Sequence, residues 1–519
     1  MASITHHQDK KTGAVYRYSV ESYWDKEKQA PRNKQVYLGK VNPETGELMP
    51  SRSKDNTNEN TEPTGGVSAT SRVAGPFLLL DQLSRKHRLY KLIDKCFKGD
   101  SGLIMSLVFF LVHKGIALSR AQSWSQAVLH PFTDNIDSRR ISELLKRISE
   151  DDRLRFLSLW MADNQEDDCL FYDITSISSY AQSNEYTRRG YNRDGESLEQ
   201  INLAMLFGCE SGLPMFYRRM PGNITDVSTL KTTVKSLDYL APGAMHLVLD
   251  RGFYSISNID ELYRRKYKFT VSVPTGRKWV EQLIDKHYEN IALPQNYLIV
   301  KEDEALYAVT ELIKWGDKHR CYAHIYYNAE HSAADFDAFT RKLLALKEEL
   351  ESNNIVEAHE TMYEKYFIIK ETPKRGRKVE FDNQAIQKHR KRYSGFFCII
   401  SNKTKSPEKA LRTYRDKDAV ENSFDDLKNS LDMKRLRVHS SGAMDSRLFL
   451  QFLALIYVSE IRKVTRGNEK LKNLTVRDVM EQMETLSRIK FSKRYGQVYT
   501  ETTPLQRDIM LAFGVSLPA

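Results

Sequence analysis

The order of short apolar runs between residues 169 and 273 restricts the fold more than any other feature of this sequence. Three strand-like runs come first, and the turn triplet Glu210-Ser211-Gly212 joins the second to the third. A helical pattern, a buried strand, a second helical pattern and a further strand follow in TDVSTLKTTVKSLDY, MHLVLD, IDELYRR and YKFTVSV. A hairpin that leads into alternating strands and helices predicts an α/β fold with a mixed sheet flanked by helices.

This pattern is interrupted after residue 273. Between residues 274 and 395 the sequence holds strand-like pieces, one long helical pattern over roughly residues 332–352, and the basic runs PKRGRK and KHRKRY. Regular structure resumes with GFFCIISN, and Ser406-Pro407 marks a helix start, with Ser at the cap and Pro in the first turn. We therefore predict a ribonuclease H-like core in two parts, 166–273 and 396–463, interrupted by a β-rich insertion domain over 274–395.

The regions outside the core differ in pattern. Strand-like alternation predicts a small β-unit over 1–50, and a near absence of large apolar residues predicts a linker over 51–75. Buried and amphipathic helical patterns predict a helical region over 76–165, and the tail over 464–519 is expected to be helical and basic. Basic residues of the helical region include Lys86, His87, Arg88, Arg139, Arg140 and Lys146. They suit either DNA binding or the solvated faces of a scaffold, and both interpretations stay open.

Charge and cysteine content indicate which partners and which cellular compartment suit this chain. The 519 residues include 79 Lys and Arg and 68 Asp and Glu. The resulting net charge of +11 weakly favours a polyanionic partner. The five cysteines are scattered and form no C-x-x-C pair, so we expect reduced cysteines in a cytoplasm. No signal peptide is expected, and the apolar run 103–112 is predicted to be a buried helix because it is too short to span a bilayer.

Residues 411–431 combine opposite charges in a regular spacing. Tyr414 and Lys417 precede Glu421 by seven and four residues, and Lys428 follows it by seven. On one helix, at about 100° per residue, all four fall within an arc of roughly 60°. A carboxylate that holds a cation, beside lysines that meet an anion, suits a phosphate-handling site. Asp418-x-x-Glu421 also has capping-box spacing, and a new helix starting there would leave Tyr414 and Lys417 in the preceding turn.

Two aspartates lie where such chemistry would use them. Asp173 interrupts an apolar strand pattern, where a carboxylate is costly unless it is paired or bound to metal. Asp250 ends a buried strand, where α/β sheets place their sites. Taken singly, each also suits a structural role as a hydrogen-bonded strand residue or a turn residue. If the strands are neighbours and the helix of Glu421 packs over them, three carboxylates converge, and such a set suits two Mg²⁺ or Mn²⁺ ions acting on a phosphodiester.

These residues, in this order, resemble the DDE transposases of bacterial insertion sequences, in the subgroup with the signature Y-x2-R-x3-E-x6-K. The matching pieces are Asp173 in YDITS, Asp250 in LDRGFYS, and Tyr414-x2-Lys417-x3-Glu421-x6-Lys428. The segment PGNITD, which ends at Asp226, is also similar to one that these proteins carry between the two aspartates. One departure is Lys417, where the pattern has Arg, so that the charge is kept and the bidentate fork is lost.

The resemblance implies a ribonuclease H-like catalytic domain with two divalent ions, Mg²⁺ or Mn²⁺. It implies that Asp173, Asp250 and Glu421 are both the catalytic residues and the metal ligands. The DNA-binding candidates are Tyr414, Lys417 and Lys428, which the resemblance places near the cut. Arg251 is a further candidate, which suits either a contact with a phosphate or an ion pair with one of the three acids.

The implied function is that of an insertion-sequence transposase, which binds the terminal inverted repeats of its element and joins them to target DNA. The same resemblance implies a homodimer in the synaptic complex. It also implies a location in the bacterial cytoplasm, associated with the nucleoid and not with a membrane. Two alternatives stay open: a metal-dependent nuclease on the same fold without strand transfer, and a domesticated DNA-binding protein that has lost the reaction.

Three further acids and one histidine are interpreted structurally. Asp226 is expected to be an acid at a helix N-terminus rather than a ligand. His246 is expected to be a hydrogen-bonded core histidine, and Asp425 and Asp426 are expected on a solvated face.

Overall fold

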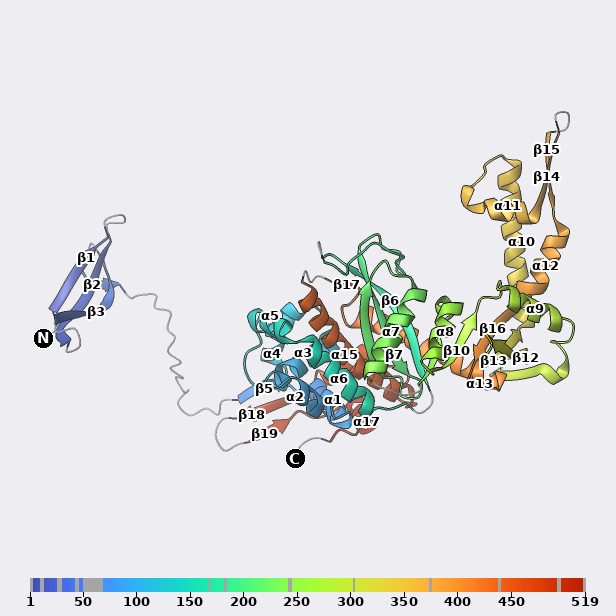
Figure 1. Ribbon diagram of the computed structural model, residues 1–519. Coiled ribbons are helices and arrows are strands. Elements are labelled where there is room, and N and C mark those ends of the chain that lie inside the picture. Colours follow the sequence, from blue (N-terminus) through green and yellow to red (C-terminus); the bar gives the residue numbers. More distant parts are fainter. Residues whose placement is uncertain are drawn as a thin grey trace. The chain divides into compact units, whose positions relative to one another are not determined.

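The chain divides into two units, Met1–Ser68 and Ala69–Ala519. The computed structural model describes residues 3–9, 14–25, 30–42, 46–49, 69–166, 169–181, 184–240, 245–301, 304–372, 376–436, 440–491 and 496–516 (Figure 1). The predicted linker lies largely outside these ranges.

The first unit is an antiparallel sheet in the order β1-β2-β3-β4. Its strands are β1 (Ser3–Gln8), β2 (Val15–Asp25), β3 (Ala30–Val41) and β4 (Leu48–Met49). Tyr37 packs between Tyr16 and Tyr18 across the sheet, with ring centroids 6.0 and 5.4 Å apart. The strand-like alternation of the sequence therefore does form a small β-unit.

The second unit is built on a ten-stranded mixed sheet, counted over its described residues, in the order β11-β12-β13-β16-β10-β9-β6-β7-β8, with β17 on β6. The middle of this sheet is formed by β6 (Leu170–Ser179), β7 (Gln200–Gly208), β8 (Pro214–Pro221), β9 (His246–Leu249), β10 (Lys268–Val273) and β16 (Phe396–Ser401). β6, β7 and β8 pair antiparallel, whereas β9 runs parallel to both β6 and β10.

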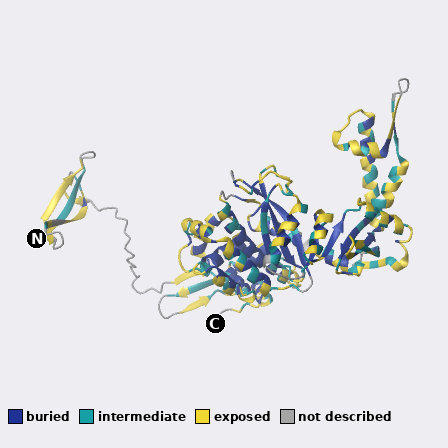
Figure 2. Cartoon of the chain, in the orientation of Figure 1, coloured by how far each residue is buried: buried dark blue, intermediate teal, exposed yellow. Residues whose placement is uncertain are grey.

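Helices connect the strands as the sequence pattern predicts. α7 (Asp226–Leu240) lies between β8 and β9 in the chain, and α8 (Ile256–Arg264) lies between β9 and β10. The central strands are almost wholly buried, as the dark blue sheet of Figure 2 shows. The predicted fold class, a mixed α/β sheet flanked by helices, is thus confirmed.

The insertion contributes strands to the same sheet. β11 (Tyr297–Lys301), β12 (Glu304–Trp315) and β13 (His319–Tyr327) extend it, because β13 pairs with β16 of the core. The other insertion elements are α9 (Lys278–His287), α10 (Ala329–Glu351), α11 (Glu360–Tyr366), β14 (Phe367–Thr372), β15 (Gly376–Phe381) and α12 (Asn383–Tyr393). A separate apolar cluster that includes Leu346 and Tyr363 holds α10, α11 and the β14–β15 hairpin together. The predicted long helix is α10.

A helical layer precedes the sheet in the chain. Its helices are α1 (Gly75–Lys86), α2 (Leu89–Cys96), α3 (Ser101–Lys114), α4 (Ala121–Ala127), α5 (Ser138–Arg147) and α6 (Glu150–Asp163). α3 is buried almost throughout and packs against α15 (Ser441–Arg466), so the prediction of a buried helix is confirmed. In the described part of the chain no single helix is long and apolar enough to span a membrane, and α3 passes the test only together with residues 118–127, across a bend of 101°.

Several basic residues of the helical layer have acidic partners within the chain. Lys86 pairs with Glu460, Arg88 pairs with Asp163 at 3.3 Å, and Arg140 pairs with Asp134 at 3.3 Å. Cations that are paired in this way contribute less to binding a polyanion. Both interpretations of this layer, DNA binding and scaffold, stay predictions.

Residues from both ends of the second unit form a small sheet. β5 (Ala69–Val73) pairs with β18 (Ser487–Phe491), which also pairs with β19 (Gln497–Tyr499). Residues 69–73 therefore belong to the second unit rather than to the linker. The tail contains the helices α16 (Val476–Met483) and α17 (Pro504–Ala512), but the prediction that it is helical throughout is wrong. Strand pairing between residues far apart in the sequence overrides the local helical pattern.

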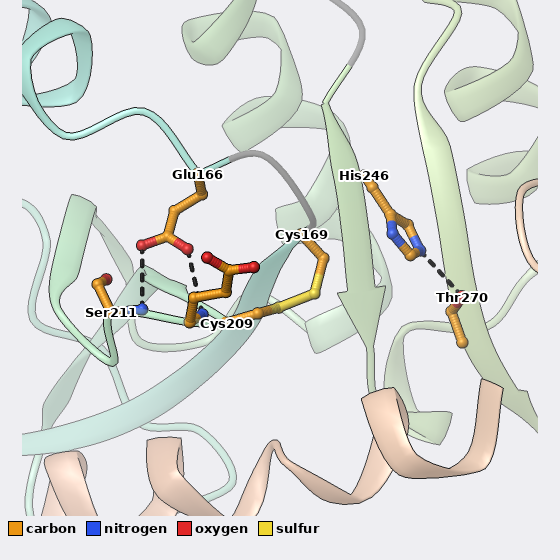
Figure 3. The surroundings of a disulfide bond; sticks show 7 residues. Glu166, Cys169, Cys209, Ser211, His246 and Thr270 are labelled. Carbon is orange, nitrogen blue, oxygen red and sulfur yellow. Dashed lines mark hydrogen bonds between the residues drawn. A yellow bond between two sulfur atoms is a disulfide. The ribbon is translucent and has the colours of Figure 1, made fainter. Parts of the chain in front are cut away.

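The prediction that all cysteines are reduced is wrong. Cys169 and Cys209 form a disulfide with a Cα–Cα distance of 5.4 Å, and Cys96, Cys321 and Cys398 are free and buried. The β6–β7 ladder causes the contact, since Leu170 pairs with Gly208 and the cysteines are the next pair outward. Figure 3 shows Glu166 beside the bond, where its carboxylate accepts the backbone N–H groups of Glu210 and Ser211 at 3.1 and 3.3 Å.

Substituting Cys209→Ser is expected to destabilise the oxidised protein by about 4 kcal/mol, because the bond closes a loop of 40 residues. Urea unfolding with and without dithiothreitol measures this: the reductant should lower the midpoint of the wild type and leave that of the variant unchanged. Alkylation of the unreduced, denatured chain at all five cysteines, rather than at three, would contradict the bond.

Candidate active site

Two adjacent parallel strands bring the predicted aspartates together. β6 and β9 pair with Leu170 opposite Leu247 and Tyr172 opposite Leu249. The next residue on each strand path is Asp173 and Asp250, so the two carboxylates project from neighbouring positions. Asp173 is the one residue of β6 that is not fully buried. The condition set by the sequence, that the two strands be neighbours, is met.

A single ammonium group lies between these carboxylates. Lys417 Nζ is 3.6 Å from Oδ2 of Asp173 and 3.6 Å from Oδ2 of Asp250. The Lys417 side chain is 9% exposed and that of Asp173 is 16% exposed, so water screens this attraction only partly. The position of Nζ marks a point where both aspartates attract a cation.

Tyr414 holds the second aspartate. Its hydroxyl donates a hydrogen bond of 2.7 Å to Asp250 Oδ1. Burial, reinforced by the neighbouring Asp250 carboxylate, raises the pKa of Tyr414, so the phenol stays protonated and remains a donor. Tyr414 belongs to α13 (Pro407–Arg415), which starts as predicted: the Ser406 side chain accepts the Lys409 N–H at 3.3 Å.

The pKa values of the two aspartates shift in opposite directions. Burial raises the pKa of Asp173 above its usual value, although the charge of Lys417 acts in the other direction. Burial also acts to raise the pKa of Asp250, but the charge of Lys417 and the hydrogen bond from Tyr414 outweigh it, and the net pKa is lowered. Asp250 is therefore firmly ionised at neutral pH, and Asp173 gains most from a further cation.

Of the two arrangements that the sequence left open, the single helical face is wrong, and a new helix that starts at Asp418 is confirmed. α13 ends at Arg415, α14 (Asp418–Asp425) begins after a break, and a π-helical segment η5 (Asp426–Ser430) follows. Lys417 occupies the N-cap position of α14, one residue before the Asp418 that capping-box spacing suggested. The break has a consequence for the site, because Tyr414 and Lys417 reach the aspartates from the end of one helix and the turn that follows it.

Glu421 lies in α14, and its side chain is outside the described part of the structure. The helix itself contacts β6. Phe424, one turn after Glu421, lines the same cavity as both aspartates, and its ring packs on Phe207 with centroids 5.8 Å apart. The helix that carries Glu421 therefore covers the two aspartates, which was the second condition set by the sequence.

Lys428 and Arg251 are not among the residues that line the cavity around this ammonium. Lys428 Nζ donates to both Asp194 oxygens at 2.7 and 2.8 Å, and so ties η5 to the connection between β6 and β7. Arg251 follows Asp250 in η2 (Arg251–Phe253) and is exposed. The predicted phosphate contacts of both residues stay predictions.

The cavity contains two residues to which the sequence assigned no role there. It measures about 290 Å³ and is lined by Asp173, Asp250, Lys417, Phe424, Arg193 and Asp226, among others. Asp226 does begin α7 as expected, but it also accepts two hydrogen bonds from Arg193 Nη2, at 2.6 and 2.7 Å. Arg193 gave no sequence signal, because it lies in a connection without hydrophobic periodicity.

Two minor expectations have opposite outcomes. His246 is buried and hydrogen-bonded to Thr270 Oγ1 at 2.9 Å, as expected for a core histidine (Figure 3). Asp426 is not on a solvated face: it is buried and paired with Arg462 at 2.6 Å. Burial raises the pKa of Asp426 to about 6. The π-helical turn of η5 directs it inward.

The donor set at Asp173 and Asp250 fits a hard divalent cation. Carboxylate oxygens are the ligands that Mg²⁺ and Mn²⁺ prefer, and Lys417 shows that a cation is attracted there. Among the described side chains, no group of three His, Cys, Asp or Glu could hold a metal ion. The third ligand expected from the sequence, Glu421, stays a prediction, because its side chain is outside the described part of the structure.

Mg²⁺ is expected to raise the melting temperature of the wild type and not that of Asp173→Asn. Binding to the folded state alone stabilises it by about 2.7 kcal/mol at a hundredfold excess over Kd. Differential scanning fluorimetry with and without Mg²⁺ measures the shift, with Asp425→Asn as the control. An equal Mg²⁺ shift in Asp173→Asn would remove Asp173 from the metal site.

Comparison with known proteins found a solved structure and a family profile. The cryo-EM structure of the piggyBac transposase synaptic complex with hairpin DNA is 10% identical to this chain, with a TM-score of 0.34, over 78% of this chain and 70% of that chain. No curated protein matches the sequence. The family profile described as "Transposase DDE domain" matches residues 164–457. That match spans more than half of the chain, both aspartates and the helix of Glu421, and the chain therefore belongs to the DDE transposase family.

Proposed function

We propose that this protein is the transposase of a bacterial insertion sequence, which binds the ends of its element and catalyses metal-dependent cleavage and strand transfer of DNA. One observation carries the proposal: Asp173 on β6 and Asp250 directly after β9 occupy neighbouring positions of two parallel strands, with a cation between them. Membership of the DDE transposase family supports it. The order β6-β7-β8-α7-β9-α8-β10 is the one that a ribonuclease H-like core requires, and we assign that fold.

The metal ligands in this proposal are Asp173, Asp250 and Glu421. Two Mg²⁺ or Mn²⁺ ions held by carboxylates supply the activation of a water or a 3′-hydroxyl and stabilise the leaving oxygen of the phosphodiester. Tyr414 fixes the orientation of Asp250 through its hydrogen bond and lowers the pKa of that carboxyl. Asp250 is thus held ionised and in place for a ligand role.

Lys417 has two roles in this proposal. Without metal it neutralises the aspartates, since its ammonium lies 3.6 Å from each. A divalent cation competes for the same oxygens, and Lys417 is then available to the phosphate of the DNA. Tyr414, Lys428 and Arg251 are assigned further phosphate contacts. The proposal also names the partners, which are the terminal inverted repeats and target DNA. It includes a homodimer in the synaptic complex and a cytoplasmic, nucleoid-associated location.

Substituting Asp173→Asn, Asp250→Asn or Glu421→Gln is expected to slow cleavage at the element end by roughly 10³-fold, about 4 kcal/mol of lost metal stabilisation. DNA affinity should change little, because the phosphate contacts remain. Cleavage of a labelled duplex in Mg²⁺, with binding measured by anisotropy, tests this.

Asp425→Asn is the matched control, since Asp425 lies on the same helix and is exposed. Full activity in any of the three variants removes that residue from the triad. The substrate comes from the DNA that flanks the gene, where short inverted repeats are expected.

Strand transfer separates a transposase from a nuclease on the same fold. Pre-cut element ends, supercoiled plasmid, protein and Mg²⁺ are expected to give joined products, detected on an agarose gel and by sequencing the junctions. Cutting without joining would favour the nuclease. Binding without any metal-dependent cutting would favour a domesticated DNA-binding protein.

A further inference from the structure

The connection between β6 and β7 carries a second cation into the candidate active site. Arg193 lines the cavity that contains Asp173 and Asp250. Its Nη2 donates to both oxygens of Asp226, and its Nη1 donates to Ser176 Oγ at 3.4 Å. Ser176 lies on β6, three residues after Asp173. The guanidinium is therefore fixed between β6 and the start of α7.

Independent contacts fix this connection on both sides of Arg193. The Asn192 side chain accepts the N–H groups of Asp194 and Glu196 at 2.8 and 3.2 Å and donates to Ser178 Oγ at 3.1 Å. Gly190 packs so closely that a Cβ there would lie 2.1 Å from a backbone oxygen of Gly222. The position of Arg193 is thus set before any ligand arrives, which lowers the entropic cost of binding one.

Two further ion pairs close the connection against the helix side of the site. Asp194 pairs with Lys428 at 2.7 Å, and Glu196 pairs with Arg435 at 2.8 Å. The connection is therefore anchored without Arg193. The Arg193–Asp226 pair has side chains 27% and 37% exposed, and ion pairs that water reaches in this way add little stability.

The chemistry of Arg193 suits a phosphate oxygen. A guanidinium has five N–H donors in a planar fork, and the bonds to Asp226 and Ser176 leave some of them available. Planar forks bind phosphate in a bidentate manner, which an ammonium cannot do. Lys417 is the ammonium in this cavity and Arg193 is its guanidinium. A guanidinium, which position 417 lacks, is therefore present on another element, with N–H donors that Asp226 and Ser176 do not occupy.

We propose that Arg193 is a phosphate-binding residue of the active site and that Asp226 is the positioning residue that orients its guanidinium. The proposal rests on the proposed function, because the ligand is a DNA phosphodiester at Asp173 and Asp250. Arg193 binds a non-bridging oxygen of that phosphate and stabilises charge as it develops there. Asp226 acts through Arg193 and does not bind the metal.

Single-turnover cleavage of an element-end duplex in Mg²⁺ tests both roles. Arg193→Ala is expected to slow the chemical step by about 10²-fold, as for loss of one preorganised donor. Arg193→Lys should recover at most a tenth of the wild-type rate, because it restores charge without the fork. Asp226→Asn should be slower than wild type, and the double variant no slower than Arg193→Ala, because the two residues act as a unit.

Arg477→Ala is the matched control, since it removes the same charge from the exposed surface of α16. Its rate should equal that of the wild type. If Arg193→Ala does not fold, Arg193→Lys decides alone: a wild-type rate in that variant overturns the need for a guanidinium. The Mg²⁺ concentration needed for half-maximal cleavage separates the two roles of Asp226. If Asp226→Asn needs more Mg²⁺ than the wild type and Arg193→Lys does not, Asp226 is a metal ligand and its positioning role is overturned.

A binding measurement in Ca²⁺ keeps this inference separate from the proposed function. The salt dependence of affinity for the same duplex should fall in slope by about 0.9 in Arg193→Ala, which corresponds to one phosphate contact. If the wild type binds and never cuts, the proposed function fails while the slope still decides the role of Arg193. If the wild type cuts and Arg193→Ala keeps both rate and slope, only the role of Arg193 is overturned.

Discussion

The parallel pairing of β6 with β9 is the constraint on which the rest of the site depends. It places Asp173 and Asp250 at neighbouring positions of a largely buried sheet. Two carboxylates so close repel each other, and burial adds to the cost of ionising them. A cation between them lowers this cost, and Lys417 supplies one. The elements that surround the pair all serve to deliver cations or to hold these acids.

The insertion takes part in that delivery. β13 pairs with β16, which pairs with β10, so the insertion strands are continuous with the core sheet. The Tyr326 hydroxyl of β13 donates to the carbonyl of Pro407 at 2.7 Å, and Pro407 is the first residue of α13. α13 in turn carries Tyr414 to Asp250. The insertion, which interrupts the core in the sequence, thus holds the first residue of α13, the helix that carries Tyr414.

Local pattern was enough to predict the element order of the core and the place of both aspartates. Asp173 stood out because it is an acid in an apolar strand, and Asp250 because it ends one. The contacts that local pattern could not supply join distant residues. Cys169 and Cys209 meet through strand register, and Lys428 meets Asp194 across 234 residues. Arg193 was missed for the same reason, since its partner Asp226 lies 33 residues away and its connection has no periodicity.

The break between α13 and α14 agrees with the capping-box alternative rather than with one continuous helix, and both arrangements located the same residues. Spacing placed Tyr414, Lys417 and Glu421 together on one ideal helix, whereas the chain turns at Lys417. Because the chain turns there, Lys417 reaches the aspartates of the sheet. On one straight helix it would lie on the same face as Glu421. On the proposed function Lys417 leaves the aspartates when metal binds them and gains the DNA phosphate as its anion. If the aspartates held a metal ion, Lys417 would be free to pair with a DNA phosphate, and metal and DNA would then favour each other's binding.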